Sequence, residues 1–416
     1  MTEYKRFELL DGVYLTAVRT DACARSCLSM TLLTQLSQET AAMNAVLPDV
    51  LMRGSSRLPD TDAVMAALAS MDGEIAPVVR KLGELQAVGL RALFAHEAFE
   101  PMAQELTAML LSPNTRGGLL RPDWVKDAAA ALPARQAVPA SDAERYAAVR
   151  LTQEMCCFED YAVPVLGDEE GAKAIHYQKL TRRYHDLLAA SPLEIFYCGT
   201  EPPRKAAQTL AELLVTMPRG EPDEELGTDV RMNSVDASPR IVEEAVEGLH
   251  ENRLAVGWRL GDQMEEPDVA ALRLLAACLE QALRSKLDER THVCLDLHKG
   301  LLTLHTPLHG SRETACGVIE AQLELLRAGA PDESVRAAAL ETLSAQLLQT
   351  QRDAAALEHY WLERATLGLL YSPEELDGLL HEVAPEDVTN AARALECDMI
   401  YVCTAEPVDE SDSLEA

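Results

Sequence analysis

Histidine and cysteine are the residue types of this 416-residue chain best suited to metal or nucleophilic chemistry, and none stands in an established catalytic motif. The sequence has no HExxH or HxxEH zinc motif, no GxSxG nucleophile elbow, no P-loop and no GxGxxG turn. None of the ten cysteines has the paired CxxC spacing of a zinc site. The local motifs of the common hydrolases, nucleotide-binding proteins and zinc peptidases are therefore missing.

Two short clusters have spacings that metal ligands use. His305 and His309 stand four residues apart in LHTPLHG, but this segment ends a predicted strand. Residues i and i+4 of a strand lie about 13 Å apart, too far to share one ion. His96, Glu97 and Glu100 (HEAFE) are an alternative helical metal face without an evident third ligand. We interpret His305 and His309 as surface or edge-strand histidines, and the HEAFE residues as solvated polar side chains.

Charge and hydropathy exclude several classes of partner. The 37 Lys and Arg residues stand against 68 Asp and Glu residues, so the net charge is −31. Nucleic acids and anionic membranes both attract basic faces, and we expect neither as a partner. No apolar run approaches the roughly 20 residues of a membrane span, and the N-terminal MTEYKRFELLDG lacks a signal-peptide core. We therefore predict a cytoplasmic protein with reduced thiols, with a disulfide framework as the alternative. A redox pair of Cys23 and Cys27 is a separate possibility.

Apolar periodicity predicts strands and helices that recur in similar order along the chain. The predicted strands cover Val13–Thr20, Cys27–Leu36, Gly83–Phe94, Ser191–Gly199, Arg253–Gly261 and Gly300–Leu308. The predicted helices cover Ala41–Met52, Glu100–Leu111, Asp123–Leu132, Pro267–Leu287, Glu313–Ala328 and a helix that Pro331 opens and that runs to Thr350.

The ends of the two halves also match. Glu194–Pro202 reads EIFYCGTEP and Asp398–Pro407 reads DMIYVCTAEP, which sets Tyr197 opposite Tyr401. A similar order of elements with a similar ending indicates duplication. We predict an α+β fold of two tandem homologous units, each an antiparallel-rich sheet with helices packed on it.

An acidic segment separates the two predicted units. Residues 218–229 (PRGEPDEELGTD) carry Pro, Gly and acidic side chains without apolar periodicity, which is typical of a linker. The predicted organisation is a first unit over 1–217, the linker over 218–229, a second unit over 230–408 and an acidic tail over 409–416.

This layout resembles the insulinase-like (pitrilysin, inverzincin) zinc metallopeptidases. Residues 44–60 (NAVLPDVLMRGSSRLPD) are similar to a family helix that ends in a Gly-Ser step followed by a basic residue and a Pro. In active members this helix carries HxxEH, whose two His bind zinc and whose Glu activates the metal-bound water. Residues 141–167 and 254–261 resemble further family segments, so the resemblance spans nearly the whole chain.

The resemblance implies a degenerate zinc motif. Anchored on the Gly-Ser step, the first His position holds Ala45, the catalytic Glu position holds Pro48 and the second His position holds Asp49. Ala45 offers no ligand atom and Pro48 offers no base, so only Asp49 could touch a metal. The family's third ligand, a Glu on a later helix, falls in the run 128–131, which is all Ala. We expect no catalytic residue, no metal ligand and no bound cofactor in this chain.

The second half departs from active members as well. Those members place an Arg and a Tyr that hold substrate in a segment that Ser285–Leu297 (SKLDERTHVCLDL) matches only in shortened form. Arg290 is a candidate for the Arg, and Cys294 or Leu295 occupies the region of the Tyr. We assign no role to these residues.

The resemblance is closest to the non-catalytic subunits of paired bacterial members. It implies an inactive subunit that pairs with a homologous subunit with an intact HxxEH, which supplies the zinc, to form a peptide-processing chamber. A homodimeric peptide-binding or scaffold protein of the same fold is the first alternative. An active zinc metallopeptidase with a relocated site is the second.

Overall fold

The computed structural model describes residues 3–220, 226–231, 238–260, 266–329 and 331–405. Their contacts divide the chain into two compact units, and each unit draws on both halves of the sequence. As far as they are described, residues 1–137, 163–228 and 346–375 make the first unit, and residues 138–162, 229–345 and 376–416 make the second. No helix among the described residues has both the length and the apolar character that crossing a membrane requires.

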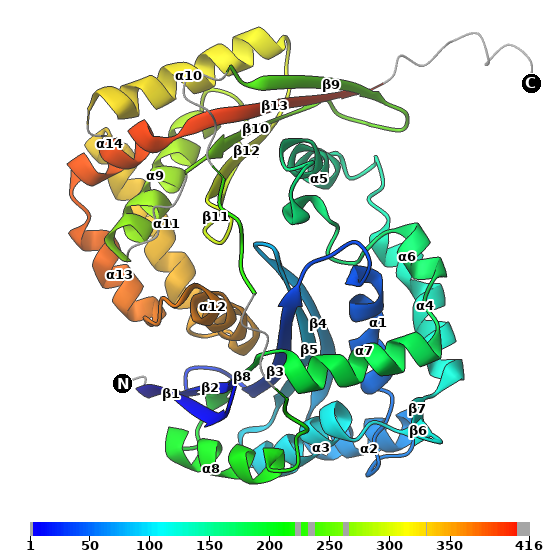
Figure 1. Cartoon of the computed structure of the whole chain (residues 1–416). Coiled ribbons are helices and arrows are strands. Elements are labelled where there is room, and N and C mark those ends of the chain that lie inside the picture. The colour runs from blue at the N-terminus through cyan, green and yellow to red at the C-terminus, as the bar shows by residue number, and fades with distance from the viewer. Residues whose placement is uncertain (1–2, 221–225, 232–237, 261–265, 330, 406–416) are drawn as a thin grey trace, which may run out of the picture. The chain divides into compact units, whose positions relative to one another are not determined.

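A six-stranded sheet forms the centre of the first unit (Figure 1). In spatial order its strands are β1 (Glu3–Leu10), β2 (Val13–Arg19), β8 (Leu193–Gly199), β3 (Ser26–Gln35), β5 (Leu85–Phe94) and β4 (Glu74–Leu82). Strands β2 and β8 run parallel, and the other neighbours run antiparallel. Strand β3 is buried along almost its whole length, which shows that both faces of the sheet are covered.

A five-stranded sheet forms the centre of the second unit. In spatial order its strands are β11 (His292–Asp296), β12 (Leu301–Pro307), β10 (Arg253–Arg259), β13 (Glu396–Ala405) and β9 (Arg240–Val246). Strands β13 and β9 run parallel, and the other neighbours run antiparallel.

The two sheets share one topology. Strands β2, β8, β3, β5 and β4 of the first unit correspond in order and direction to β9, β13, β10, β12 and β11 of the second. Tyr197 lies on β8 and Tyr401 on β13, which are corresponding strands. The predicted α+β class with two antiparallel-rich sheets is confirmed. The common origin of the two units stays a prediction.

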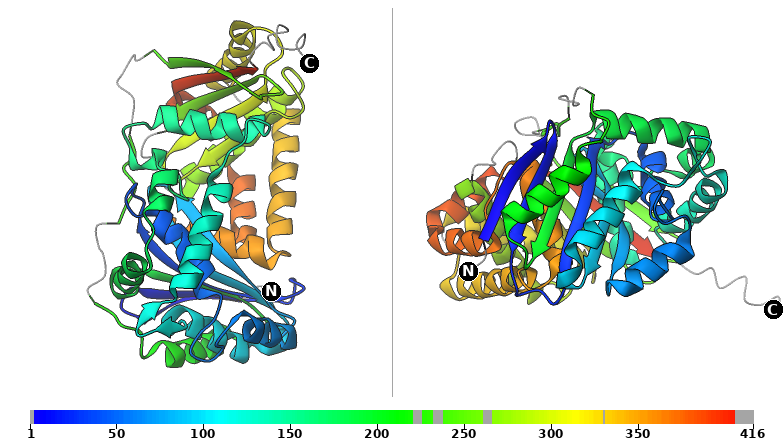
Figure 2. Two further views of the ribbon diagram at one scale, coloured as in Figure 1. Left: turned by 90° about the vertical axis from the view of Figure 1, so that its right-hand side faces the viewer. Right: turned by 90° about the horizontal axis from the view of Figure 1, so that it is seen from below.

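Helices cover the sheet of the first unit. Helix α1 contacts β4 and β5, α3 contacts β3 and β5, and α8 contacts β1 and β2. Helix α12 contacts β8 and β3. Figure 2 shows α8 lying across the strands in the view from below. The helices of this unit are α1 (Ala41–Leu51), α2 (Thr61–Ser70), α3 (Phe99–Leu111), α4 (Pro122–Gln136), α6 (Glu169–Lys173), α7 (Tyr177–Ala190), α8 (Pro203–Leu214) and α12 (Ala354–Leu367), with a short turn of helix at His96–Ala98.

Helices also cover the sheet of the second unit. Helix α5 contacts strands β10, β12 and β13, and α9 contacts β11. The helices of this unit are α5 (Ala143–Met155), α9 (Glu266–Arg284), α10 (Arg312–Ala328), most of α11 (Glu333–Thr350), most of α13 (Pro373–Glu382) and α14 (Pro385–Ala394), with a short turn of helix at Asp160–Ala162.

One helix from each half of the sequence packs in the unit of the other half. Helix α5 precedes the predicted boundary and packs in the second unit, whereas α12 follows it and packs in the first. The predicted units 1–217 and 230–408 are continuous segments of sequence, whereas each compact unit of the structure combines several segments. The sequence division stays a prediction about where the two repeats begin and end. The predicted linker lies in part outside the described residues, and the predicted acidic tail lies entirely outside them.

Candidate functional site

Helix α1 carries the three positions that the resemblance assigns to the zinc motif. It packs against α4, α6, α7 and strands β4 and β5. Ala45 and Pro48 are buried, while Asp49 is half-buried on the side of α4. The helix is continuous through Pro48, whose carbonyl accepts a hydrogen bond from the Met52 amide at 3.0 Å. Since Pro48 has no N–H, the carbonyl of Asn44 receives no bond from it.

The turn after α1 explains the Gly-Ser step. A Cβ on Gly54 would lie 2.8 Å from the Leu58 carbonyl oxygen and 3.0 Å from the ring of Trp124. Only glycine fits this close approach without moving the backbone. The Ser55 hydroxyl accepts hydrogen bonds from the amides of Arg57 and Leu58, both at 3.1 Å. The anchor of the motif therefore has a structural role of its own.

Two ion pairs join α1 to α4 beside the degenerate motif. The Asp49 carboxylate pairs with the guanidinium of Arg135, and Arg53 pairs with Asp127 at 3.1 Å. Arg135 lies beyond the helix end predicted at Leu132, because α4 continues to Gln136. Sequence reasoning therefore missed Arg135. A basic side chain about one turn beyond the predicted end is favourable in the last turn of a helix, and it could have indicated the longer helix.

The Ala run of α4 contains the position that faces this part of α1. Residues 127, 131 and 135 are spaced by four, so they share one stripe of the helix. Ala131 therefore lies between the two residues that pair with α1, and it contributes a methyl group and no ligand atom. Ala128 is buried among the core residues. The assignment of the third-ligand position to 128–131 stays a prediction.

A buried polar network holds the first turn of α1. The Asn44 side chain donates to Gln86 at 2.7 Å and accepts from Arg183 at 2.9 Å. Gln86 in turn donates to the carbonyls of Ala41 and Val165. These bonds satisfy polar groups in a region where an unpaired group would cost about 1–3 kcal/mol. The sequence analysis did not identify any of these residues.

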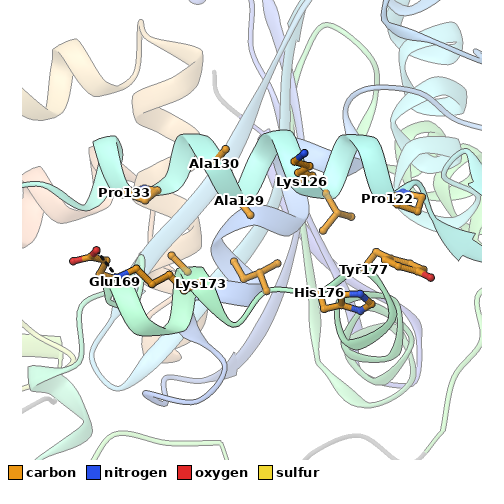
Figure 3. A pocket seen from close by; sticks show the side chains of 12 residues that line it. Pro122, Lys126, Ala129, Ala130, Pro133, Glu169, Lys173, His176 and Tyr177 are labelled. Carbon is orange, nitrogen blue, oxygen red and sulfur yellow. Dashed lines mark ion pairs between the residues drawn. The ribbon is translucent and has the colours of Figure 1, made fainter.

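A groove of about 480 Å³ lies on the other side of α4. Figure 3 shows α4 along one side of it and α6 with the start of α7 along the other. The apolar lining includes Val125, Ala129 and Ile175. Lys173 pairs with Glu169 at 2.7 Å, and His176 caps the first turn of α7. The lining is mainly apolar, with Lys126, Lys173, Glu169 and His176 among its charged or titratable side chains.

The candidate substrate-holding residue of the second half is engaged within its own unit. The Arg290 guanidinium pairs with Glu251 at 2.7 Å and with Asp288 at 3.1 Å. Hydrogen bonds from Arg290 and His309 hold the pKa of Asp288 well below its usual range. Arg290 is therefore fixed by two carboxylates.

The second unit also contains a buried ionic cluster that the sequence analysis missed. Glu159 accepts hydrogen bonds from Arg259 at 2.7 Å and from Lys299 at 2.6 Å, and Arg259 also pairs with Asp398. Burial raises the pKa of Glu159, but the bonds from Arg259 and Lys299 outweigh it and lower the pKa overall. This cluster joins β10, β13 and the loop after β11.

The structure does not bring together the residues of either candidate metal cluster from the sequence analysis. His309 lies 2.8 Å from Asp288, while His305 lies on β12 beside His292. His96 bonds Ser26 at 2.8 Å, and Glu100 pairs with Lys205. Within the described ranges, the grouping of three potential ligands is His292, Cys294 and His305 in the second unit.

Comparisons with known proteins extend over almost the whole chain. No family model matches the sequence. The chain is 22% identical over 413 residues to the protein named probable inactive metalloprotease YmfF of Bacillus subtilis (strain 168). The match covers 94% of this chain and 95% of that relative.

Solved structures share the fold at low sequence identity. A conserved protein from Enterococcus faecalis V583 has a TM-score of 0.80 at 19% identity. The peptidase M16 inactive domain from Pseudomonas fluorescens has a TM-score of 0.77 at 15% identity. Both matches cover 97% of this chain and 99% of the other.

Proposed function

Because the chain belongs to the insulinase-like (M16) peptidase family and resembles a relative named as inactive, we propose that it is a non-catalytic subunit. It pairs with a homologous subunit whose HxxEH is intact. The pair forms a peptide-processing chamber in which the partner binds zinc and carries out hydrolysis. This chain completes the chamber and holds peptide.

The observation that carries the proposal is the state of helix α1. The helix is present in full length, yet its motif positions hold Ala45, Pro48 and Asp49. Zinc hydrolysis needs ligand atoms and a base to activate water. Ala45 and Pro48 supply neither, and the Asp49 carboxylate is paired with Arg135. The scaffold is retained while the chemistry is lost.

The ion pairs between α1 and α4 replace a metal as the link between these helices. In an active member, zinc joins ligands from both helices. Here Asp49 of α1 pairs with Arg135 of α4, and Arg53 in the turn after α1 pairs with Asp127 of α4. These side chains are partly exposed, so each pair contributes only modestly to stability.

Two features suit this chain to holding a peptide. The groove along α4 is lined mainly by apolar side chains, which bind peptide side chains without strong sequence preference. Strands β1 and β4 are the edges of the first sheet, so each has one side without a neighbouring strand among the described residues. An extended peptide binds such an edge through main-chain hydrogen bonds.

The proposal is tested by reconstitution. This chain and an insulinase-like homologue with intact HxxEH from the same organism are purified separately and mixed. Mass is measured by light scattering, and peptidase activity is measured for each chain alone and for the mixture. We expect a one-to-one complex that cleaves peptides only when both chains are present.

Matched variants assign the chemistry to the partner. Replacing the catalytic Glu of the partner's HxxEH is expected to abolish activity of the complex, whereas Asp49→Ala in this chain leaves it unchanged. A stable homodimer that ignores the homologue would favour the scaffold alternative. Activity of this chain alone that is lost in Asp49→Ala would favour the active-peptidase alternative.

A further inference from the structure

Three potential metal ligands lie on one face of the β11–β12 hairpin. His292 on β11 is directly opposite His305 on β12, and their rings stack with centroids 5.1 Å apart. Cys294 follows two residues along β11, so its side chain is on the same face. One ligand atom from each of the three residues lies within 4.8 Å of the others.

His305 has a ring nitrogen that is buried without a partner. The residue is 4% exposed, and its Nε2 lies 3.0 Å from the Thr303 hydroxyl. Its Nδ1 has no hydrogen-bond partner among the described residues. Burial, with the nearby His292 and Arg253, lowers the pKa of His305 to about 3, so the ring is neutral. With Nε2 donating to Thr303, Nδ1 has a lone pair available to a cation.

The charges around the cluster are balanced. Glu144 in the first turn of α5 lies 3.7 Å from Nε2 of His292 and 3.0 Å from the Arg253 guanidinium. Glu251 also pairs with Arg253, at 3.2 Å. An incoming cation would therefore meet a guanidinium already paired with two carboxylates. Glu144 supplies negative charge beside the His292 ring.

We propose that His292, Cys294 and His305 bind a borderline-soft divalent transition metal, represented by Zn²⁺, with Glu144 or water as the fourth ligand. Two imidazoles and a thiolate suit zinc and exclude the oxygen-preferring Mg²⁺ and Ca²⁺. Bond lengths of about 2.0–2.1 Å to nitrogen and 2.3 Å to sulfur put tetrahedral ligand atoms roughly 3.3–3.8 Å apart. Small side-chain rotations, easiest for the solvent-accessible Cys294, close the present separations.

Metal binding at this site displaces a proton. The metal binds the thiolate form of Cys294, so the thiol proton is released when the metal binds. When bound, the metal fastens the edge strand β11 to β12 and stabilises the folded second unit by mass action.

The test uses the full-length chain stripped of metal by a chelator under reducing conditions. Co²⁺ and Zn²⁺ are titrated separately, and bound metal is counted after dialysis. We expect one equivalent of Co²⁺ with a thiolate-to-cobalt charge-transfer band, which Zn²⁺ displaces. Cys294→Ser is expected to remove that band, and Cys294→Ser and His292→Ala to weaken binding by roughly tenfold or more.

Matched variants separate this site from other thiols and carboxylates. Cys157→Ser replaces another accessible cysteine of the second unit, and Asp49→Ala replaces the remaining polar residue of the degenerate motif. Both are expected to leave stoichiometry, band and affinity unchanged. A charge-transfer band that survives in Cys294→Ser, or tight binding that depends on Cys157 or Asp49, would overturn the proposal. So would failure of the wild-type chain to retain either metal.

Discussion

At the scale of single residues, the ion pair between Asp49 and Arg135 occupies the position that the family resemblance assigns to a zinc ligand. Asp49 stands at a predicted ligand position, and its carboxylate is paired with a guanidinium from α4. Arg135 supplies a fixed positive charge where the family resemblance implies a metal cation. The pair stabilises the packing of two helices and has no means of activating water.

We predict a modest coupling energy for this pair. In a double-mutant cycle with Asp49→Ala and Arg135→Ala, the interaction term in the free energy of unfolding is expected to be about 0.5–1 kcal/mol. The side chains are 25% and 35% exposed, so solvent screens their attraction. Urea unfolding of the four proteins measures the term. The Arg53–Asp127 pair, with Asp127 66% exposed, is the control and should give a smaller value. A coupling above about 3 kcal/mol would contradict a screened surface pair.

Glu159 gives the second unit a defined response to acid. Its folded pKa is lowered from the usual 4.5, because hydrogen bonds from Arg259 and Lys299 outweigh the opposing effect of burial. A carboxyl whose pKa is lower in the folded state stabilises the fold above the unfolded pKa. That contribution is therefore complete above about pH 4.5 and is lost as the pH falls through the folded value.

We predict that Glu159→Gln lowers stability near neutral pH and flattens the loss of stability in acid. The measurement is the free energy of unfolding as a function of pH from neutrality to below pH 4.5. Glu170→Gln, at an exposed position, is the control and should follow the wild-type profile. If Glu159→Gln and wild type lose stability in parallel below pH 4.5, the proposed linkage is wrong.

At the scale of elements, helix α12 is fixed to the first sheet by a buried ion pair. Glu358 of α12 is fully buried and pairs with Arg80 of β4 at 2.7 Å. One carboxylate oxygen of Glu358 and one guanidinium nitrogen of Arg80 have no hydrogen-bond partner among the described residues. The pair is therefore incompletely satisfied, and each charge depends on the other.

We predict that Arg80→Met destabilises the protein by about 3–5 kcal/mol, because it leaves a buried carboxylate unpaired. The double variant Arg80→Met/Glu358→Met is expected to recover most of that loss, since neither charge remains. Chemical denaturation measures both. Arg25→Met is the matched control, because it breaks the exposed Arg25–Glu74 pair and should cost less than about 1 kcal/mol. A double variant as unstable as the single one would refute this account.

At the scale of the whole molecule, the exchange of α5 and α12 makes the two halves of the sequence interdependent. A chain that ends at residue 217 contains α5 but lacks the helix that covers β3 and β8. A chain that begins at residue 218 contains α12 but lacks α5, which packs on β10 and β13. Each half would expose apolar surface that the intact chain buries.

We predict that the fragments 1–217 and 218–416 are poorly soluble when expressed separately and soluble when co-expressed. Solubility and co-elution on size exclusion measure this outcome. The intact chain carrying a protease site within the predicted linker is the control and should stay soluble after cleavage. A fragment 1–217 that is soluble and unfolds cooperatively by itself would show that α12 is dispensable.

Several features followed from the sequence with little ambiguity. Buried strands such as Val13–Arg19 and Ser26–Gln35 are rich in residues of high strand propensity, and their assignment is confirmed. The order of elements and the matching ends around Tyr197 and Tyr401 indicated a duplicated topology, which both sheets display. The residue types at positions 45, 48 and 49 are sequence facts, and no fold can give Ala45 or Pro48 a ligand atom.

The edge strands were among the elements that sequence patterns missed. Strands β1, β4, β9 and β11 carry mixed polar and apolar residues, because an edge strand is partly solvated and lacks a continuous apolar run. Helix α4 ends at Gln136, beyond the end at Leu132 that its apolar pattern predicts. The additional turn contains Arg135, which pairs with Asp49. Apolar periodicity indicates a helix or strand only where the segment is strongly buried. The edge strands and the last turn of α4 are partly exposed, so their apolar patterns were too weak to identify them.

The sequence alone predicts which side-chain chemistry is missing from the proposed motif, because that depends only on the residue types at positions 45, 48 and 49. The tertiary structure decided which residues meet. His305 is four residues from His309 in sequence, yet its neighbour in space is His292 on the other strand of the hairpin. Strand pairing brings opposite residues close, whereas His309 lies beyond the end of β12 and contacts Asp288. The same holds for Asp49 with Arg135 and for α5 and α12, whose partners lie far along the chain. Side-chain chemistry is a local property, whereas proximity is set by packing that couples distant segments.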